Sequence, residues 1–242
     1  MDSIIYIDER AKILELSRLF MDMDWEEAGK RFTKSYWQVQ YHLENALSWN
    51  FRLGSNLMEE VVACLLGGYG LKAELGLLAF HRIKNLRLIH KGVALSEVEE
   101  AMSRPFKVNG KEVHYRFPHQ KAKYIYSFLQ RSDLDDLEKL CGLDLRNKLM
   151  DIEGIGPKTA SWIARNYSNC DDVAIIDVHI YRAGRIAGFV DPKWNMRKDY
   201  FKIEDSFLDF CHSINASPAK MDSIIWNQMK RSNRRAIELL NV

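Results

Sequence analysis

The chain has 242 residues, of which 47% are hydrophobic, and its 35 Lys and Arg residues stand against 33 Asp and Glu residues for a formal net charge of +2. This length corresponds to one large domain or two small ones. The apolar content and mixed charge exclude a disordered or low-complexity protein. A net charge so near zero argues at first sight against a nucleic-acid partner, because such proteins usually carry a basic surplus.

The N-terminal segment and the cysteines restrict localisation and cofactor class. Acidic residues near the N-terminus and the absence of a long apolar run predict neither a signal peptide nor a membrane span, so we expect no membrane partner. We expect a cytoplasmic protein associated with the nucleoid, or a nuclear one in a eukaryote. The four cysteines are far apart and form no CxxC pair, which is typical of buried or free thiols and excludes a local metal or iron–sulfur cluster.

Helical periodicity dominates the remaining sequence. Apolar residues from Met58 to Leu65 recur at three- and four-residue steps and predict a helix that ends in the glycine-rich stretch 67–70. A second pattern of this kind begins at Pro118 and runs to Leu129. Further helices are predicted at 72–85, 95–103, 134–141, 145–152, 158–167, 178–188, 198–213 and 218–230.

Strand signals are few. Residues 1–8 and the segment 108–117 are the two candidates, and the second predicts a hairpin that turns at Asn109 and Gly110. We therefore expect an all-α fold with at most a small β-hairpin, in which two helical lobes surround a cleft within a single unit, 1–242. The expected lobes are 1–55 plus 190–242, and 56–189, the latter with two short helices joined by a hairpin at 145–167.

Charge is unevenly distributed although its sum is small. The stretch 104–124 contains six basic residues and one acid, and a second basic cluster lies at 230–235. Acidic residues gather between them, at 133–144. Runs of this kind are usually solvated helix faces, and a nucleic-acid surface is the alternative. The low net charge therefore does not exclude a local DNA-binding face.

The segment 149–167 contains the pattern Gly154-Ile155-Gly156-Pro157 between two apolar-periodic stretches. Glycine allows a positive φ and a close approach of the backbone to another surface. Pro157 fits the first helical position, where an amide hydrogen has no intrahelical partner. The pattern predicts a tight hairpin whose amides point outward beside a helix N-terminus, a geometry suited to phosphate. An ordinary corner between two helices is the alternative.

The sequence EGIGPKTASW (153–162), with IIDVHIY (175–181) after it, resembles the signature of the helix-hairpin-helix-GPD superfamily of DNA base-excision glycosylases. The position of Lys158 is similar to that in the 8-oxoguanine DNA glycosylase branch. RFPHQKAKYI (116–125) resembles a helix start of bacterial and archaeal members. The resemblance covers 116–230 well and 55–90 only as a helical pattern. The chain lacks the grouped cysteines of endonuclease III, and only about 50 residues precede its first clear helix, where eukaryotic 8-oxoguanine enzymes carry a long sheet domain. The resemblance therefore implies a compact microbial type.

The resemblance implies that Lys158 and Asp177 are catalytic. Lys158 would attack C1′ of the deoxyribose as a neutral amine, which a helix N-terminus and desolvation both favour, and would form a Schiff base. Asp177 would cap its helix and support the cationic sugar, whereas a capping role alone is the plain alternative. His179 would lie near the DNA backbone, or else be an ordinary core or surface histidine.

The resemblance also implies a pocket for an extruded base, which is the usual way to reach a base within a duplex. Trp162 and Trp226 would stack on this base, and Asp222 would accept its N–H groups. For both tryptophans, packing in the core is the alternative. Tyr69 is the candidate wedge that fills the gap left in the duplex.

The remaining expectations concern DNA, ions and assembly. The hairpin backbone at Gly154, Ile155 and Gly156 would contact the DNA phosphates, together with Lys121 of the basic stretch. Hairpins of this type can hold a monovalent cation through backbone carbonyls, and no other cofactor is expected, since the sequence offers no ligand set for zinc or for a catalytic metal. We expect a monomer whose partner is damaged double-stranded DNA.

The sequence thus predicts a bifunctional DNA glycosylase/AP lyase of base excision repair, which excises 8-oxoguanine opposite cytosine and nicks the strand by β-elimination. Two alternatives stay open. One is a related glycosylase for another damaged base, and the other is a non-catalytic DNA-binding protein that keeps the hairpin. Lys158 and Asp177 discriminate between these classes, because a pure binder needs neither the amine nor the carboxylate.

Overall fold

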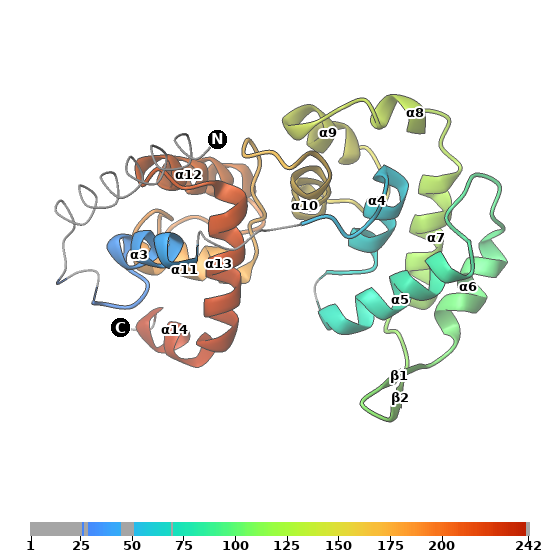
Figure 1. Ribbon diagram of the computed structural model, residues 1–242, viewed down its shortest axis with the longest axis horizontal. Coiled ribbons are helices and arrows are strands. Elements are labelled where there is room, and N and C mark those ends of the chain that lie inside the picture. The colour runs from blue at the N-terminus through green and yellow to red at the C-terminus, as the bar shows by residue number, and fades with distance from the viewer. Residues whose placement is uncertain (1–25, 27–28, 45–50, 69, 241–242) are drawn as a thin grey trace, which may run out of the picture.

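The computed structural model describes residues 26, 29–44, 51–68 and 70–240 of the chain. Figure 1 shows two groups of helices side by side, which we call the central lobe (51–173) and the terminal lobe (29–44 and 174–240). The helices of the central lobe are α4 (Leu57–Leu65), α5 (Ala73–Asn85), α6 (Leu95–Ser103), α7 (Pro118–Leu129), α8 (Leu134–Leu137), α9 (Gly142–Leu149) and α10 (Pro157–Ser168).

Local sequence explains where these helices begin. The side chain of Asn56 accepts a hydrogen bond from the amide of Glu59 at 2.9 Å and so caps α4. Pro118 and Pro157 occupy the first turns of α7 and α10, where proline is favoured. The apolar faces of α4, α7 and α10 then meet in one core, in which Val61, Ile125 and Ile163 are fully buried.

A short antiparallel hairpin extends from the central lobe. Strands β1 (Phe106–Val108) and β2 (Lys111–Val113) pair with Phe106 opposite Val113. Both turn residues have positive φ, 50° at Asn109 and 76° at Gly110, as a two-residue hairpin turn requires. The predicted turn is confirmed, but the strands span 106–113 and not 108–117.

The terminal lobe is built from both ends of the described chain. Its core buries Trp37 and Phe207 together with apolar side chains of the C-terminal helices. The lobe contains α3 (Lys34–Glu44), α11 (Val178–Ala187), α12 (Tyr200–Ser213), α13 (Pro218–Arg231) and α14 (Asn233–Leu240). The sequence predicted α11, α12 and α13 closely, whereas α3 and α14 were not predicted.

The structure corrects the expected lobe boundary. Ile180 and Ala183 of α11 are buried in the core of the terminal lobe, and α11 packs against α13 and α14. The chain therefore changes lobe between Val173 and Ala174, so that 174–189 leaves the lobe expected at 56–189. Residues 51–55, expected in the other lobe, belong to the central lobe instead. Amphipathic periodicity showed that α11 buries one face but not which core receives it.

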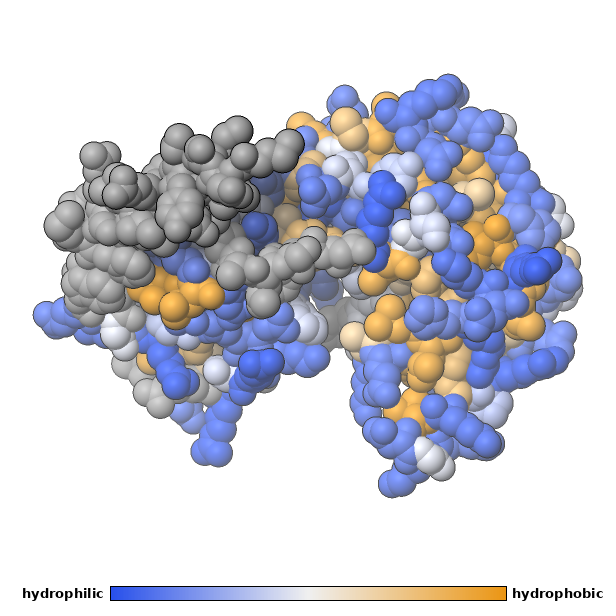
Figure 2. Space-filling model, in the orientation of Figure 1, coloured by the Kyte–Doolittle hydropathy of each residue, from blue (hydrophilic) through white to orange (hydrophobic). Residues whose placement is uncertain are grey.

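Three smaller points complete the comparison. Helix α9 covers 142–149 where 145–152 was predicted, and α8 is a single turn. The strand predicted at 1–8 lies outside the described residues. Within the described part of the chain, no helix is both long and apolar enough to span a bilayer. The all-α prediction is confirmed, and the space-filling view is hollowed between the two lobes, as expected of a cleft (Figure 2).

Candidate functional site

Lys158 and Asp177 lie at the N-termini of helices that belong to different lobes. Lys158 is half-buried in the first turn of α10, directly after Gly156 and Pro157. Asp177 is the N-cap of α11, and its Oδ1 accepts hydrogen bonds from the amides of His179 at 2.7 Å and Ile180 at 3.0 Å. The predicted capping role of Asp177 is confirmed. Two charged groups therefore occupy helix N-termini in different lobes.

The pKa of His179 shows that several charged side chains lie close to its imidazole. Burial lowers the pKa of His179, the carboxylate of Asp177 opposes this shift, and the cations of Arg182, Lys158 and Lys230 add to it. These cations come from α10, α11 and α13, so three helices converge at the imidazole. The lowered pKa favours a neutral imidazole at neutral pH.

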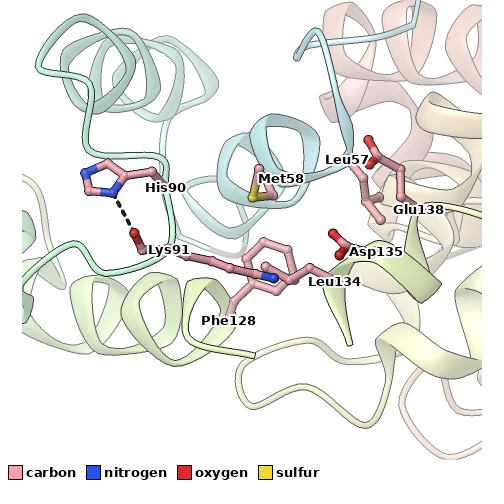
Figure 3. A pocket seen from close by; sticks show the side chains of 8 residues that line it. All are labelled: Leu57, Met58, His90, Lys91, Phe128, Leu134, Asp135 and Glu138. Carbon is pink, nitrogen blue, oxygen red and sulfur yellow. Dashed lines mark hydrogen bonds between the residues drawn. The ribbon is translucent and has the colours of Figure 1, made fainter. Parts of the chain in front are cut away.

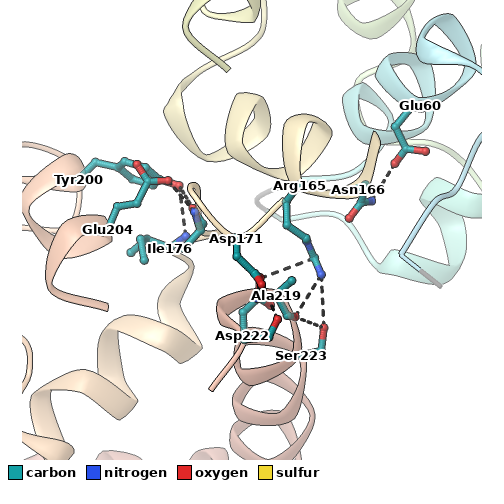
Figure 4. A network of polar contacts seen from close by, with 12 residues as sticks. Glu60, Arg165, Asn166, Asp171, Ile176, Tyr200, Glu204, Ala219, Asp222 and Ser223 are labelled. Carbon is teal, nitrogen blue, oxygen red and sulfur yellow. Dashed lines mark hydrogen bonds and ion pairs between the residues drawn. The ribbon is translucent and has the colours of Figure 1, made fainter. Parts of the chain in front are cut away.

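Asp222 belongs to the same electrostatic neighbourhood. Burial raises the pKa of Asp222 to about 6. The Asp177 carboxylate raises it further, whereas the cations of Arg165 and Lys158 lower it. Its Oδ2 lies 3.7 Å from Arg165 Nη2 and has no hydrogen-bond partner among the described residues (Figure 4). Asp222, the predicted acceptor for a base, thus faces Arg165 of the central lobe with only 6% of its surface exposed.

Trp226 lies beside these groups, one turn after Asp222 on α13. Its indole meets the imidazole of His179 edge to face, with ring centroids 6.3 Å apart. The ammonium of Lys230 lies 4.4 Å from the indole centroid. The ring is half-buried, so it combines packing with partial access. The structure therefore brings Trp226 and His179 together and adds Lys230 to them.

Trp162 has different surroundings. Its half-buried ring packs against the core of the central lobe, and a Cβ added to Gly67 would lie 2.8 Å from Trp162 Cζ3. The indole thus fits closely beneath the end of α4, which is what the packing alternative predicts. Tyr69, the wedge candidate, lies outside the described residues.

The hairpin between α9 and α10 uses its two glycines differently. Gly154 has φ 87°, and a Cβ there would come within 2.4 Å of the Tyr124 ring. Gly156 has φ −94°, and a Cβ there would meet nothing within 4 Å. Ile155 is buried, and its amide donates to the carbonyl of Ile152. The expectation that all hairpin amides point outward is therefore wrong for Ile155, while Gly156 faces open space.

Lys121 points into the protein. Its Nζ donates to the carbonyl oxygens of Leu65 at 2.5 Å and Gly67 at 3.4 Å, at the C-terminal end of α4. Desolvation lowers the pKa of this lysine. Tyr115 donates to the next carbonyl, that of Leu66, at 2.6 Å. The structure thus gives Lys121 a helix-capping role where a phosphate contact was expected.

Sequence reasoning missed one buried carboxylate near the site. Glu204 of α12 accepts hydrogen bonds from Arg146 Nη1 on α9, Ser161 Oγ on α10 and the amide of Ala174, each at 2.8 Å. Glu204 was assigned no role because its contacts lie 30 or more residues away in the chain. An acidic residue on an amphipathic helix gives no local signal of burial.

A separate cavity lies away from these residues, in the central lobe (Figure 3). Its volume is about 290 Å³, and it is lined by residues of α4, α7, α8 and the turn that contains His90 and Lys91. None of the predicted site residues lines it. In the described part of the chain, no three His, Cys, Asp or Glu side chains are grouped to hold a metal ion.

Comparison with known proteins agrees with the fold. The family model described as 8-oxoguanine DNA glycosylase matches residues 42–216. The 8-oxoguanine DNA glycosylase/AP lyase of Metallosphaera sedula is 32% identical over 127 residues, which cover 48% of this chain and 59% of that protein. The match thus spans about three fifths of the length of this curated relative.

Two solved structures of 8-oxoguanine DNA glycosylase from Methanocaldococcus jannaschii are also similar. The first has a TM-score of 0.62 at 25% identity and covers 82% of this chain and 94% of that one. The second is a complex with a 15mer DNA that contains 8-oxoguanine. Its TM-score is 0.57 at 26% identity, and it covers 81% of this chain and 89% of that one.

Proposed function

The chain belongs to the 8-oxoguanine DNA glycosylase family, and on this premise we propose that it is a bifunctional glycosylase/AP lyase of base excision repair. Its substrate would be duplex DNA with 8-oxoguanine opposite cytosine. The similarity of the chain to a structure titled as a complex with 8-oxoguanine DNA supports this substrate class. Membership of this family agrees with the resemblance of the segments EGIGPKTASW and IIDVHIY to the helix-hairpin-helix-GPD signature.

The observation that carries the proposal is the convergence of Lys158 and Asp177 from two lobes. A buried carboxylate and a half-buried amine at the starts of two helices supply a nucleophile and a partner for positive charge. Their charges act on the same neighbours, His179 and Asp222, which places all four groups in one neighbourhood. A protein that only binds DNA has no need of this arrangement.

In the proposed reaction, the neutral amine of Lys158 attacks C1′, and the bond from C1′ to the base breaks. The base leaves with the bonding electrons and takes up a proton. The amine nitrogen then loses one of its two protons, and the C1′–O4′ bond breaks as O4′ takes up a proton. A protonated Schiff base, which keeps the other nitrogen proton, now joins Lys158 to C1′. Removal of a C2′ proton expels the 3′ phosphate by β-elimination, and water releases the lysine. Asp177 stabilises the cationic sugar and exchanges protons with the amine.

The other residues have supporting roles in this proposal. Trp226 stacks on the extruded base, typically worth about 1–3 kcal/mol, and Asp222 accepts its N–H groups. His179 lies near the backbone of the extruded nucleotide, while Trp162 packs beside Gly67 and supports the end of α4. Tyr69 fills the gap in the duplex.

DNA binding completes the proposal. The backbone at Gly154 and Gly156 contacts phosphate, and Gly156 offers the open side of the hairpin. The Ile155 amide takes no part, because it donates to the carbonyl of Ile152. A monovalent cation held by hairpin carbonyls belongs to the same proposal, and replacing K⁺ by tetramethylammonium in a binding assay tests it. The protein acts as a monomer on damaged double-stranded DNA.

Borohydride trapping tests the proposal. Duplexes with single lesions are incubated with the protein, borohydride reduces any Schiff base, and a denaturing gel reveals a covalent adduct. We expect an adduct with 8-oxoguanine opposite cytosine that is absent in Lys158→Gln. Lys148→Gln, which alters an exposed lysine of the preceding helix, is the matched control and should keep the adduct.

The outcomes separate the alternatives. An adduct with another lesion but not with 8-oxoguanine identifies a related glycosylase. Duplex binding with no adduct for any lesion identifies a non-catalytic binder. An undiminished adduct in Lys158→Gln contradicts the assignment of the nucleophile.

A further inference from the structure

Glu204 of the terminal lobe holds both chain segments that carry the proposed catalytic pair. Its Oε1 accepts hydrogen bonds from Ser161 Oγ and from the amide of Ala174, both at 2.8 Å. Ser161 lies one helical turn after Lys158 on α10, and Ala174 lies three residues before Asp177. One buried carboxylate oxygen therefore holds α10, which carries Lys158, and also the segment that leads to Asp177, the N-cap of α11.

Tyr200, one turn before Glu204 on α12, holds the same segment through two further hydrogen bonds. Its hydroxyl donates to the carbonyl of Ala174 at 3.0 Å and accepts from the amide of Ile176 at 3.2 Å (Figure 4). Ile176 directly precedes Asp177, so three backbone groups just before the carboxylate are held by α12. A segment without helix or strand structure is thereby given a defined position.

The second carboxylate oxygen of Glu204 also has a partner. Glu204 Oε2 forms an ion pair with Arg146 Nη1 at 2.8 Å, and the side chains are only 3% and 8% exposed. Each carboxylate oxygen thus has a direct donor, in contrast to Asp222, whose Oδ2 has none among the described residues. A buried ion pair is weak evidence for stability, because desolvation offsets its Coulomb attraction. A carboxylate that has a donor on each oxygen and joins four segments is better suited to fixing geometry.

We propose that Glu204 and Tyr200 are positioning residues that set the separation between Lys158 and Asp177. The inference rests on the proposed function. Neither side chain is placed against DNA, since both are buried. Their effect is indirect: they hold α10 and the segment 174–177 in one frame, and a shift of about 1 Å between reacting groups can slow a reaction about 100-fold.

The test compares three conservative variants. Tyr200→Phe removes the hydroxyl alone, and Glu204→Gln removes the charge with little change in size. Glu60→Gln is the matched control, because Glu60 is also a buried carboxylate that accepts from two backbone amides, those of Leu53 and Gly54, and from Asn166. Its backbone contacts lie at the start of the central lobe, away from the segment 174–177.

For each variant we measure thermal stability, affinity for a duplex with a tetrahydrofuran abasic analogue, and the single-turnover rate of 8-oxoguanine excision at saturating protein. All three variants should lose thermal stability. We expect the excision rate of Tyr200→Phe and Glu204→Gln to fall at least about ten-fold with affinity within about two-fold, whereas Glu60→Gln keeps the wild-type rate. Wild-type rates in Tyr200→Phe and Glu204→Gln would overturn the inference, as would an equal loss in Glu60→Gln.

A double-mutant cycle identifies the group through which Tyr200 acts. If Tyr200 positions Asp177, then Tyr200→Phe should slow the wild-type protein but not an Asp177→Asn protein further. Additive losses in the cycle would show that Tyr200 acts elsewhere and would overturn the inference.

A second readout does not depend on activity. Lys158 is labelled by reductive ¹³C-methylation and observed by NMR, with Lys158→Gln used to assign its signal. The signal should move in Tyr200→Phe and stay in Glu60→Gln, and an unmoved signal in Tyr200→Phe would overturn the positioning role. A wild-type protein inert on every lesion would instead contradict the proposed function, and the NMR comparison would still decide the positioning role.

Discussion

The carboxylate of Asp222 lies 3.7 Å from the guanidinium of Arg165, and this ion pair joins α13 of the terminal lobe to α10 of the central lobe. Both side chains are less than 10% exposed. The Arg165 cation nevertheless does not offset the cost of burial, since the pKa of Asp222 is raised to about 6 from 3.8. The pair therefore joins the two lobes at a cost in stability that depends on pH.

Asp222→Asn should remove this pH dependence. An acid whose pKa is raised by folding binds its proton more tightly in the folded state, so the wild-type protein loses stability as the pH rises from about 4 to about 6. The pKa values of Asp222 in the folded and unfolded states differ by about two units, which corresponds to about 3 kcal/mol in the free energy of unfolding. We expect the free energy of unfolding of Asp222→Asn, relative to wild type, to increase by about this amount between pH 4 and pH 7. Urea unfolding at both pH values measures it.

Asp133→Asn is the control of opposite sign. A hydrogen bond from Arg131 lowers the pKa of Asp133, so this carboxylate adds stability above its unfolded pKa and loses that contribution as the pH falls. The stability of Asp133→Asn relative to wild type should therefore stay nearly constant from pH 7 to pH 4 and increase as the pH falls below about 4, which is the opposite direction to Asp222→Asn. An Asp222→Asn difference that is equal at both pH values would contradict the assigned pKa.

Asp177 should separate capping from catalysis. Asparagine caps a helix about as well as aspartate, whereas alanine costs about 1 kcal/mol. We expect Asp177→Asn to unfold near the wild-type temperature but to excise 8-oxoguanine far more slowly, and Asp177→Ala to lose both stability and activity. Calorimetry with single-turnover kinetics measures the two effects. Normal specific activity in Asp177→Asn would reduce the residue to a cap.

The two hairpin glycines should respond differently to alanine. Gly154→Ala introduces a Cβ at φ 87° and against the Tyr124 ring, so we expect a loss of about 2 kcal/mol or more in unfolding free energy. Gly156→Ala meets no protein atom and should leave stability within about 0.5 kcal/mol while weakening binding to duplex DNA. Urea unfolding and fluorescence anisotropy measure the pair. Unchanged DNA affinity in Gly156→Ala would remove the hairpin from the interface.

The sequence predicted those features whose cause is local. Apolar periodicity located α4, α7 and α13 within a residue or two, and the Asn109-Gly110 turn located the hairpin. The N-cap role of Asp177 was also predictable, because its hydrogen bonds reach only two and three residues ahead.

Features that depend on distant contacts were not predictable in this way. Charge along the chain does not show where a side chain points, and Lys121 turns inward to carbonyls more than 50 residues away. In the same way, Glu204 is distinguished from a solvated acid only by partners 30 to 58 residues away. The lobe to which α11 belongs likewise depends on α13 and α14, which follow it in the chain.

The two tryptophans assigned to the base pocket should differ under substitution. Trp226 is half-buried beside His179 and Lys230, so Trp226→Ala should weaken binding to lesion duplexes far more than binding to undamaged DNA. Trp162 packs beneath Gly67, so Trp162→Ala should chiefly lower the free energy of unfolding, by about 3 kcal/mol. Anisotropy titrations with both duplexes and urea unfolding separate the effects. Equal losses of both affinities in Trp226→Ala would assign its ring to the core, whereas a lesion-specific loss in stable Trp162→Ala would return that ring to the pocket.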